Sequence, residues 1–505
     1  MATEPVSQRA YRAACPNCGA PVEFRSAASA FAVCSFCKST VVREGDALRR
    51  IGTSAELFDD HSPLQLGAAG KYQGAAFTLV GRLQYRYTEG TWNEWHALFD
   101  SGKSGWLSED NGRYVIAFDA PLEGTAPAAT SLKAGAQVMV AGQGWSVGSV
   151  SAAKLIAAQG ELPYRPNLDR GFVVSDLRNT RGEVGTLDYG EAGAPRWSIG
   201  RTVAISELAM TGLAAPAEKT LEGRAVECPS CGAALEVKLS TTQSIACHQC
   251  HAVVDVSKGV GGDLQHYAQQ SGAEPLIPLA STGMLTLGKR ELSWQVVGYA
   301  ERCEVPDGDD EQTFWREYLV YHRTEGFAFI VDAQDGWSWT APITGVPEGA
   351  GNVVKFDGAV YRKLYDYTGM VTYVLGEFYW QVTQNQRTLN TDYQGTGAAS
   401  ARRLNREQTG AGDTQEVVWS GGESLAADAV MKAFRLAPDK RAALRRDALP
   451  TAFNAASLLA KIFFWGFVVV VVLMLFRCGG ASDSGSGYRT GGGSYGGFSS
   501  GGGHK

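Results

Sequence analysis

The sequence has little of what marks the common enzyme and nucleic-acid-binding classes. Of its 505 residues only seven are histidine, and neither a phosphate-binding P-loop nor the HExxH pattern of zinc proteases occurs. The net charge is -6, so the chain has no overall basic field of the kind that attracts phosphate backbones. The first residues, MATEPVSQRAYRAACPNC, contain no apolar run typical of a signal peptide, and we expect residues 1–14 to be flexible.

Cysteine is scarce outside a single pattern. Eight of the ten cysteines form CxxC pairs, which are joined in twos by spacers of fifteen residues, and only Cys303 and Cys478 stand alone. Paired thiolates suit the tetrahedral site of structural zinc, and four sulfur ligands leave no open position for a catalytic water. We therefore predict two structural Zn²⁺ ions in two zinc ribbons, residues 15–50 and 226–258, in a reducing cytoplasm. The predicted ligands are Cys15, Cys18, Cys34 and Cys37 in the first ribbon, and Cys228, Cys231, Cys247 and Cys250 in the second.

Two further residue types are notable at the ribbons. Gly19 and Gly232 follow the second cysteine of each ribbon, as expected where a tight turn needs a positive φ. His248 and His251 lie beside the last cysteines of the second ribbon. Because four cysteines already complete the tetrahedron, we interpret both histidines as surface residues rather than ligands.

The ribbons belong to a longer internal repeat. The second set of cysteines follows the first at a constant distance of 213 residues, and the segments after the ribbons match as well. FTLVGRLQYRY matches WQVVGYAERC, WNEWHALF matches WREYLVYH, and GELPY matches GEFYW. These segments are short, rich in Val, Phe, Tyr and Trp, and separated by glycine-containing turns, which is typical of antiparallel β-structure.

We therefore predict a mainly β fold in which each zinc ribbon is followed by an antiparallel β-domain, residues 57–212 and residues 274–425. Each domain is expected to be a sandwich or a strongly bent barrel of roughly eight or more strands. The segment SAAKLIAAQG could be mistaken for a helix. Its counterpart VTYVLGEFYW alternates like a strand, so both segments are predicted to be strands.

The second repeat resembles a known family. The residues that carry the resemblance are GEFYW at 376–380, Asp392 and Tyr393, Trp419 and Ser420, and the segments WQVVG and WREYLVY. They are similar to the bacterial domain of unknown function 4178 family. The first repeat departs from this pattern, with Leu162, Tyr164 and Leu177 at the positions of Phe378, Trp380 and Tyr393. The resemblance implies a frequent association with zinc ribbons, membrane segments and bacterial envelope or membrane-stress gene clusters, but no particular activity.

The C-terminal region predicts a membrane anchor. Residues 458–476 form a nearly uninterrupted apolar run, which at about 1.5 Å per residue is long enough to span a bilayer core, and we assign a single transmembrane helix to residues 455–477. Residues 426–454 look helical, basic and broken at Pro438 and Pro450. The Gly/Ser-rich tail, 478–505, should be flexible. The Lys/Arg excess before the helix predicts a single-pass protein of the inner membrane, with the bulk of the chain cytoplasmic and the tail outside.

Three classes of function remain open. An enzyme would have to use Glu161 and Glu377 of the Gly-Glu motifs, with Asp176 and Asp392, as acid and base. The alternative is that each Gly-Glu carboxylate ties down backbone N–H groups, and its recurrence in both copies favours a structural element over one active centre.

The other two classes are a nucleic-acid-binding protein and a scaffold. Residues 9–50 carry seven basic and three acidic residues, but the second ribbon lacks such an excess, which argues against a shared nucleic-acid surface. We expect no enzyme, and interpret the chain as a membrane-anchored scaffold or adaptor with protein partners and structural zinc.

Overall fold

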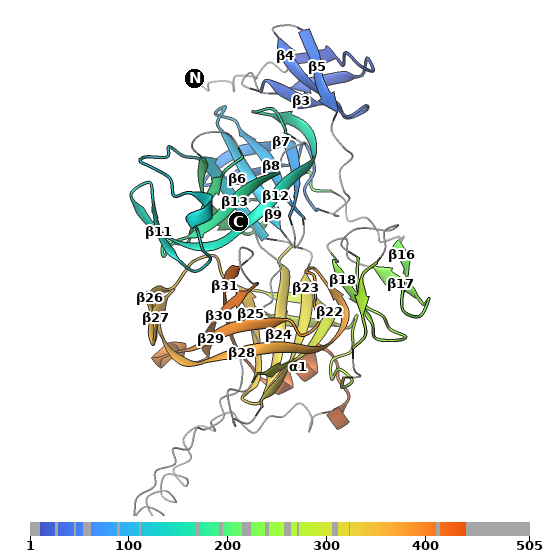
Figure 1. Cartoon of the computed structure of the whole chain (residues 1–505), viewed down its shortest axis with the longest axis vertical. Helices are drawn as coiled ribbons and strands as arrows, with labels where there is room; N and C mark the ends of the chain where they lie inside the picture. The colour runs from blue at the N-terminus through green and yellow to red at the C-terminus, as the bar shows by residue number, and fades with distance from the viewer. Residues whose placement is uncertain are drawn as a thin grey trace, which may run out of the picture.

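The computed structural model describes residues 11–25, 29–44, 47–53, 62–87, 91–110, 113–167, 171–190, 195–214, 224–237, 242–256, 264–269, 272–305, 312–322, 324–410 and 415–440. Within these ranges the chain forms two β-barrels, each with its own small ribbon; Figure 1 draws the first barrel in blue to teal and the second in yellow to orange. The barrels touch: Ser149 pairs with Glu416, and the Thr202 hydroxyl donates a hydrogen bond of 2.5 Å to Thr344. The prediction of a mainly β fold with two similar repeats is confirmed.

The first barrel consists of two antiparallel meanders of four strands. The meanders β7–β10 and β12–β15 join through the pairs β7–β12 and β10–β15, so the sheet closes on itself. The bounds are β7 Ala75–Arg86, β8 Thr91–Phe99, β9 Ser104–Asp110, β10 Arg113–Asp119, β12 Gln143–Leu162, β13 Gly171–Arg178, β14 Glu183–Asp188 and β15 Arg196–Val203; the short strands β6 (Ala69–Tyr72) and β11 (Gln137–Val140) pair with β7 and β12.

The second barrel repeats this order. Its meanders β22–β25 and β28–β31 join through the pairs β22–β28 and β25–β31. The bounds are β22 Glu291–Glu304, β23 Phe314–His322, β24 Gly326–Ala333, β25 Gly336–Pro342, β28 Ala359–Phe378, β29 Arg387–Gly395, β30 Arg402–Thr409 and β31 Glu416–Leu425; β21 (Thr282–Thr286), β26 (Glu348–Ala350) and β27 (Val353–Phe356) flank them. Of the two predicted architectures the bent barrel is therefore correct and the sandwich is wrong. Closure leaves no long sheet edge open to other chains.

One long strand organises each repeat. The twenty-residue strand β12 pairs first with β13, then with β7, and at Gly160–Leu162 with the ribbon strand β3 (Phe31–Val33). Strand β28 does the same with β29, β22 and the ribbon strand β18 (Ser244–Ala246). Both segments whose helix or strand character was in question are strands. The long strand carries the sheet of the barrel directly into the ribbon.

The ribbons extend beyond their predicted limits. The first contains β1 (Tyr11–Ala14), β2 (Pro21–Phe24), β3, β4 (Ser39–Glu44) and β5 (Ala47–Thr53); the second contains β16 (Arg224–Glu227), β17 (Ala234–Val237), β18, β19 (Val253–Asp255) and β20 (His266–Tyr267). The expectation of a flexible segment 1–14 is wrong for residues 11–14. These residues pair with β2, and the Tyr11 ring packs 5.9 Å from that of Phe24.

The barrel interiors are filled by side chains rather than by a channel. In the first barrel Leu83, Trp92 and Leu155 belong to the buried cluster on the inner face of the sheet. Leu79, Trp95 and Leu107 lie on the other face, where they pack with Leu64 and Leu208. In the second barrel Trp315, Phe329 and Val331 belong to the matching inner cluster. An eight-stranded barrel is just wide enough for such filling, so any cavity within it must come from a particular side chain.

The segment that follows the last strand of the second barrel packs against that barrel. Helix α1 (Ala427–Ala433) buries Val430, and Phe434 packs against Gly283 at the opposite edge, followed by a 3₁₀ turn at Pro438–Lys440. The helix predicted within residues 426–454 is thus present at Ala427–Ala433 and packs on the second barrel, and the place of this segment beside the membrane stays a prediction. No helix in the described part of the chain is long and apolar enough to cross a membrane. The predicted transmembrane helix at 455–477 and the tail at 478–505 lie outside the described residues.

Candidate functional site

The eight predicted zinc ligands converge into two clusters. Within each cluster the four Sγ atoms lie within 4.8 Å of one another. Zinc–sulfur bonds of about 2.3 Å in a tetrahedron require sulfur–sulfur distances of about 3.8 Å, whereas a disulfide needs about 2.05 Å. The donor sets therefore fit two closed Zn²⁺ sites with no open position. The Sγ–Sγ distances are 3.6 Å for Cys15–Cys37, 3.7 Å for Cys18–Cys34, and 3.7 Å for both Cys228–Cys250 and Cys231–Cys247.

Tight backbone turns aim the thiolates inward. In each turn a backbone N–H returns to the carbonyl of the first cysteine, as Gly19 N–H does to Cys15 at 2.8 Å. The residue that donates has a positive φ: 75° for Gly19 and Gly232, 56° for Lys38 and 58° for His251. The glycine prediction holds for one turn of each ribbon, and a non-glycine residue adopts the same geometry in the other.

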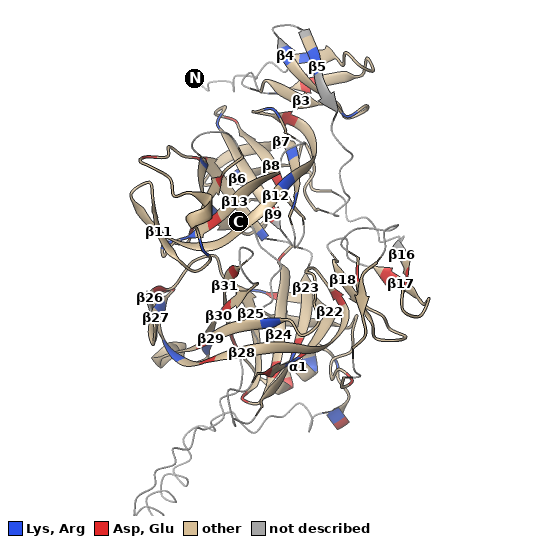
Figure 2. Ribbon diagram, viewed as in Figure 1, with Lys and Arg blue, Asp and Glu red and all other residues tan. Residues whose placement is uncertain are grey.

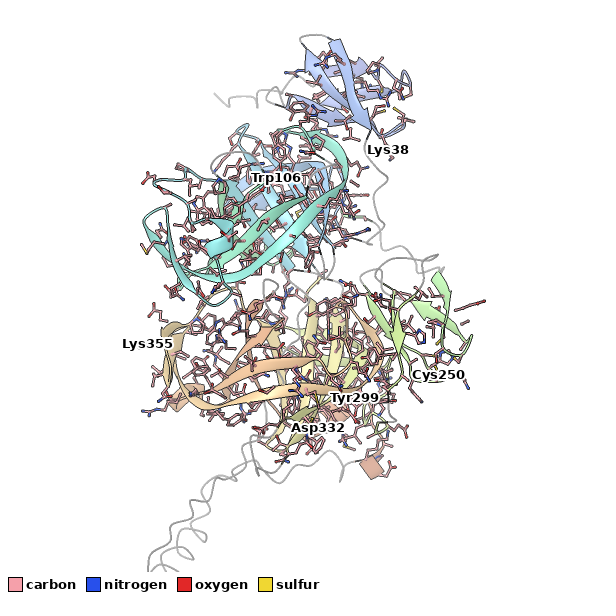
Figure 3. The ribbon with its side chains drawn as sticks, viewed as in Figure 1. Lys38, Trp106, Cys250, Tyr299, Asp332 and Lys355 are labelled. Carbon is pink, nitrogen blue, oxygen red and sulfur yellow. The ribbon has the colours of Figure 1, made fainter. Side chains whose placement is uncertain are left out.

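The two histidines of the second ribbon have different surroundings. His248 is exposed, whereas His251 lies beside the barrel, with Nδ1 3.2 Å from the Tyr373 hydroxyl. His251 is outside the four-thiolate cluster and connects the ribbon to β28. In Figure 3, Cys250 marks this ribbon at the side of the second barrel.

The Gly-Glu motifs lie at the junction between barrel and ribbon. Gly160 has a φ of 72°, and a Cβ there would lie 2.2 Å from the Val80 carbonyl oxygen. Its partner Gly81 is equally restricted, because a Cβ would lie 2.0 Å from the Glu161 carbonyl oxygen. The second repeat has the same crossing, with Gly376 opposite Gly298. This close approach of two backbones explains why both copies retain a glycine in each of two motifs.

The acids of these motifs bind the ribbons. Glu161 is buried, and its Oε1 accepts a 2.5 Å hydrogen bond from the backbone N–H of Arg25 in the first ribbon. Glu377 is also buried, and its Oε2 accepts a 2.6 Å hydrogen bond from the Thr242 hydroxyl beside the second ribbon. The interpretation that a Gly-Glu carboxylate ties down polar groups agrees with this geometry. We call this contact the ribbon latch.

The structure does not assemble the four acids considered for acid–base chemistry. Asp176 lies opposite Ser149, and Glu161 lies twelve residues further along the same strand. Asp392 is placed in the same way relative to Glu377, opposite Tyr365. Both aspartates are buried and have neighbours of their own. Asp176 Oδ1 accepts from the Thr186 hydroxyl at 3.4 Å, and Asp392 Oδ1 accepts from Asn405 Nδ2 at 2.7 Å.

Within the described residues, one hydrolase-like string occurs in a non-catalytic setting. Residues 144–148 read Gly-Trp-Ser-Val-Gly, which matches GxSxG. A nucleophile elbow requires this string at a sharp turn from strand to helix. Here it lies inside β12, and Ser146 is paired with Gln137 on one side and Arg178 on the other. The string is therefore part of the sheet.

A buried ion-pair network fills the second barrel at a place that sequence reasoning missed. The Arg302 side chain is 1% exposed, and its Nη1 lies 3.3 Å from Glu317 Oε1 and 3.4 Å from Glu407 Oε2. Its Nη2 donates to the Thr388 hydroxyl at 2.5 Å, and its guanidinium lies 5.5 Å from the Trp315 ring centroid. Burial raises the pKa of both glutamates, and the arginine opposes that shift.

The first barrel has a cavity of about 40 Å³ at the matching place. Tyr85, Trp92, Glu94 and Asp188 line it, and Trp106, labelled in Figure 3, lies on the same wall. The Tyr85 ring stacks on Trp92, with ring centroids 4.8 Å apart. Part of this site could have been found from the sequence, because WNEWHALF and WREYLVYH both contain a Trp and, two residues later, a Glu. The residue opposite the Trp, Tyr85 or Arg302, is identified only by the strand register.

A second hollow lies between the barrels. This cleft of about 80 Å³ is lined by Ser149 and Asp176 from the first barrel and by Phe327, Pro342 and Trp419 from the second. It follows from the contact between β12 and β31.

Comparison with known proteins agrees with this division of the chain. The searches of curated proteins and of solved structures gave no match. A family profile described as "Domain of unknown function (DUF4178)" matches residues 65–204 and 287–427. These stretches coincide with the two barrels and leave out the ribbons. Each begins later than the predicted β-domain, 57–212 or 274–425; the first ends earlier, at 204, and the second two residues later, at 427. The chain therefore belongs to the DUF4178 family and carries two copies of its domain.

Proposed function

We propose that the chain is a membrane-anchored cytoplasmic adaptor whose two zinc-stabilised modules bind protein partners, in a bacterial envelope or membrane-stress setting. The observation that carries the proposal is the ribbon latch, because it recurs in both copies at Glu161 and Glu377. A latched ribbon and its barrel present one continuous surface. Small ribbons of this size need zinc to fold, so the metal keeps that surface in shape.

Other features support binding over catalysis or nucleic-acid recognition. The candidate acids of each copy lie at separate points along the long strand, as described above. Figure 2 shows basic and acidic residues interspersed over both barrels, whereas a nucleic-acid-binding face gathers Lys and Arg into a patch or stripe. A surface of mixed charge therefore favours protein partners over nucleic acid.

The membrane part of the proposal depends on the sequence alone. The apolar run at 458–476 and the basic residues before it support a single-pass anchor with the bulk of the chain in the cytoplasm. A reporter that works only outside the inner membrane should be active when fused after Lys505 and inactive when fused before Met1. The opposite pattern would overturn the orientation and the reducing compartment assumed for the zinc sites.

A site-specific crosslinking experiment tests the adaptor function. Phe36 lies between two zinc ligands and its side chain is 72% exposed, so a photoreactive residue there samples the ribbon surface without entering a core. The intact chain in membranes should capture a small, reproducible set of proteins, and a chain lacking residues 458–505 should lose most of it. A photoreactive residue at Met139, 65% exposed on the first barrel, serves as the matched position away from the ribbon. If the intact chain captures no enriched partner at either position, the adaptor proposal is wrong.

A further inference from the structure

The register of the strands aligns the two barrel interiors residue by residue. Trp92 lies opposite Tyr85 in the first barrel, and Trp315 lies opposite Arg302 in the second. The matched tryptophans belong to WNEWHALF and WREYLVYH, so Tyr85 occupies the position of Arg302. Each side chain also lies over the ring of the matched tryptophan in its own barrel: Tyr85 over Trp92, and Arg302 over Trp315.

The two carboxylates that hold Arg302 are also present in the first barrel. Glu94 matches Glu317, because each lies two residues after the matched tryptophan. Asp188 likewise matches Glu407. Asp188 pairs with the residue two places before Asp176, and Glu407 pairs with the residue two places before Asp392, the matching aspartate of the second repeat. The first barrel therefore retains a tryptophan and two acids around a position that Tyr85, rather than an arginine, occupies.

The lining of the first cavity is acidic and aromatic. Its ionisable residues other than tyrosine are Glu94, Asp119, Asp188 and Arg196, which sum to a formal charge of -2. Arg196 lies with its guanidinium 4.3 Å from the Tyr164 ring centroid and 3.4 Å from Asp119. Aromatic faces combined with net negative charge attract cations, most strongly where the cation is partly desolvated.

The pKa of Tyr85 also indicates that negative charge acts inside this cavity. Burial is the main cause that raises the pKa of Tyr85, and the carboxylates of Glu94 and Asp188 add to the shift. Both acids thus act at the position where the second barrel has its guanidinium. A volume of about 40 Å³ accepts a few water-sized groups, which suits a guanidinium or ammonium head rather than a whole cofactor.

We propose that the cavity of the first barrel binds a guanidinium or ammonium cation, on a small molecule or on an Arg or Lys side chain, beside Tyr85, which stands at the position of Arg302 in the second barrel. Tyr85 and Trp92 contribute aromatic faces, and Glu94 and Asp188 contribute the compensating charge. The second barrel provides its own cation and is closed to ligands at this place. This proposal goes beyond the adaptor function and does not depend on it.

Calorimetric titration of the full chain in detergent micelles tests the proposal with matched probes. Butylguanidine and butylurea have nearly the same shape and differ in charge. Butylguanidine should bind at one site per chain, and butylurea at least tenfold more weakly. Glutarate serves as the anionic probe. The peptide acetyl-Gly-Arg-Gly-amide distinguishes the two sources, because a cavity that takes side chains binds both the peptide and butylguanidine, and one reserved for small molecules binds only the latter.

Two variants and a control make the test specific. Glu94→Gln should weaken butylguanidine binding at least tenfold, and Tyr85→Arg should abolish it by placing a guanidinium in the cavity, as in the second barrel. Glu123→Gln, an exposed acid of the same repeat, should bind like the parent. Melting temperature and zinc content verify folding, and Glu94→Gln decides the question if Tyr85→Arg does not fold. Equal binding of butylurea, unchanged binding by Glu94→Gln, or binding of glutarate in place of butylguanidine would each overturn the proposal.

Discussion

In the second barrel, a guanidinium that is 1% exposed lies between two buried glutamates; in the first, a tyrosine takes its place beside a cavity. Strand order, the glycine crossing and the ribbon latch are common to both copies. The common features are those that close the barrel and attach the ribbon. The interior can diverge because closure depends on backbone pairing, whereas a cavity depends on a few side chains.

The copies also differ at the position beside the glycine crossing. His96 lies opposite Gly81, with Nδ1 3.1 Å from the Glu161 carbonyl oxygen and Nε2 2.9 Å from the Ser104 hydroxyl. In the second barrel Leu319 lies opposite Gly298. The first copy therefore supports its latch strand with a buried, neutral imidazole, and the second with an apolar side chain.

The largest expected effect is the loss of zinc from one copy only. Structural zinc contributes on the order of 10–16 kcal/mol to the folding of small zinc modules. We expect the reduced, chelator-free chain to contain two zinc ions by elemental analysis, and Cys228→Ser to contain one. Hydrogen exchange should rise in the second ribbon and at the end of β28, with the first barrel unchanged. Cys15→Ser should give the mirror result, and fewer than one zinc in the parent would contradict the prediction.

The second largest effect should come from removing the buried cation of the second barrel, which should lower the free energy of unfolding more than the matching change in the first barrel. Arg302→Met leaves Glu317 and Glu407 without their guanidinium, and breaking such a buried pair costs roughly 3–5 kcal/mol. Tyr85→Met, at the matching place, should cost less because it strands no charge. Urea unfolding of both variants at pH 7.5 measures the difference.

The pH dependence of Arg302→Met provides a check on the cause. Burial already raises the pKa of both glutamates, and losing the arginine raises it further. Protonation then favours the folded state, so the deficit relative to the parent should shrink as the pH falls toward 5. A deficit independent of pH would mean that lost packing, rather than charge, is the main effect.

The ribbon latch should matter equally in both copies. Replacing Glu377 with Ala removes the acceptor of the Thr242 hydroxyl and should cost on the order of 1–3 kcal/mol. Glu377→Gln keeps the shape and one acceptor, so it should be better tolerated in thermal melts. Glu161→Ala and Glu161→Gln form the matched pair in the first copy. If all four variants melt like the parent while partner capture is lost, the acid is a working site and not a latch.

A smaller effect is the pH dependence that His96 gives to the first barrel. Burial lowers the pKa of His96 in the folded state, and the hydrogen bond to the Glu161 carbonyl only partly opposes this. The stability contributed by the neutral imidazole is therefore present above the unfolded pKa of about 6.5 and is lost as the pH falls below it, by up to about 1.4 kcal/mol per pH unit. Hydrogen exchange of β8 peptides at pH 7.5 and 5.5, corrected for the intrinsic exchange rates, should show this loss. His96→Leu should remove the difference between the two pH values.

By itself, the sequence determined the features that depend on local spacing. Four thiolates on two tight turns favour a zinc site wherever the chain places them, and the eight cysteines predicted as ligands do gather into two groups of four. The glycine turns also follow from short-range pattern, and the strand character of SAAKLIAAQG follows from its counterpart VTYVLGEFYW in the second repeat. The same reasoning failed at residues 11–14, where pairing with β2 decides the outcome. The helix expected after residue 425 is present as α1, but the packing of Phe434 on Gly283 could not be predicted from local pattern.

Only the tertiary structure decided which distant residues meet. The latch joins Glu161 to Arg25, 136 residues apart, and Arg302 meets Glu407 across 105 residues, so no sequence window contains either contact. The choice of barrel over sandwich likewise depends on β10 meeting β15 and β7 meeting β12. A shift of register by one residue would turn each of these side chains to the other face of the sheet, and register is fixed by the closed barrel as a whole. The cavity of the first repeat, between Tyr85 and Asp188, exists for the same reason.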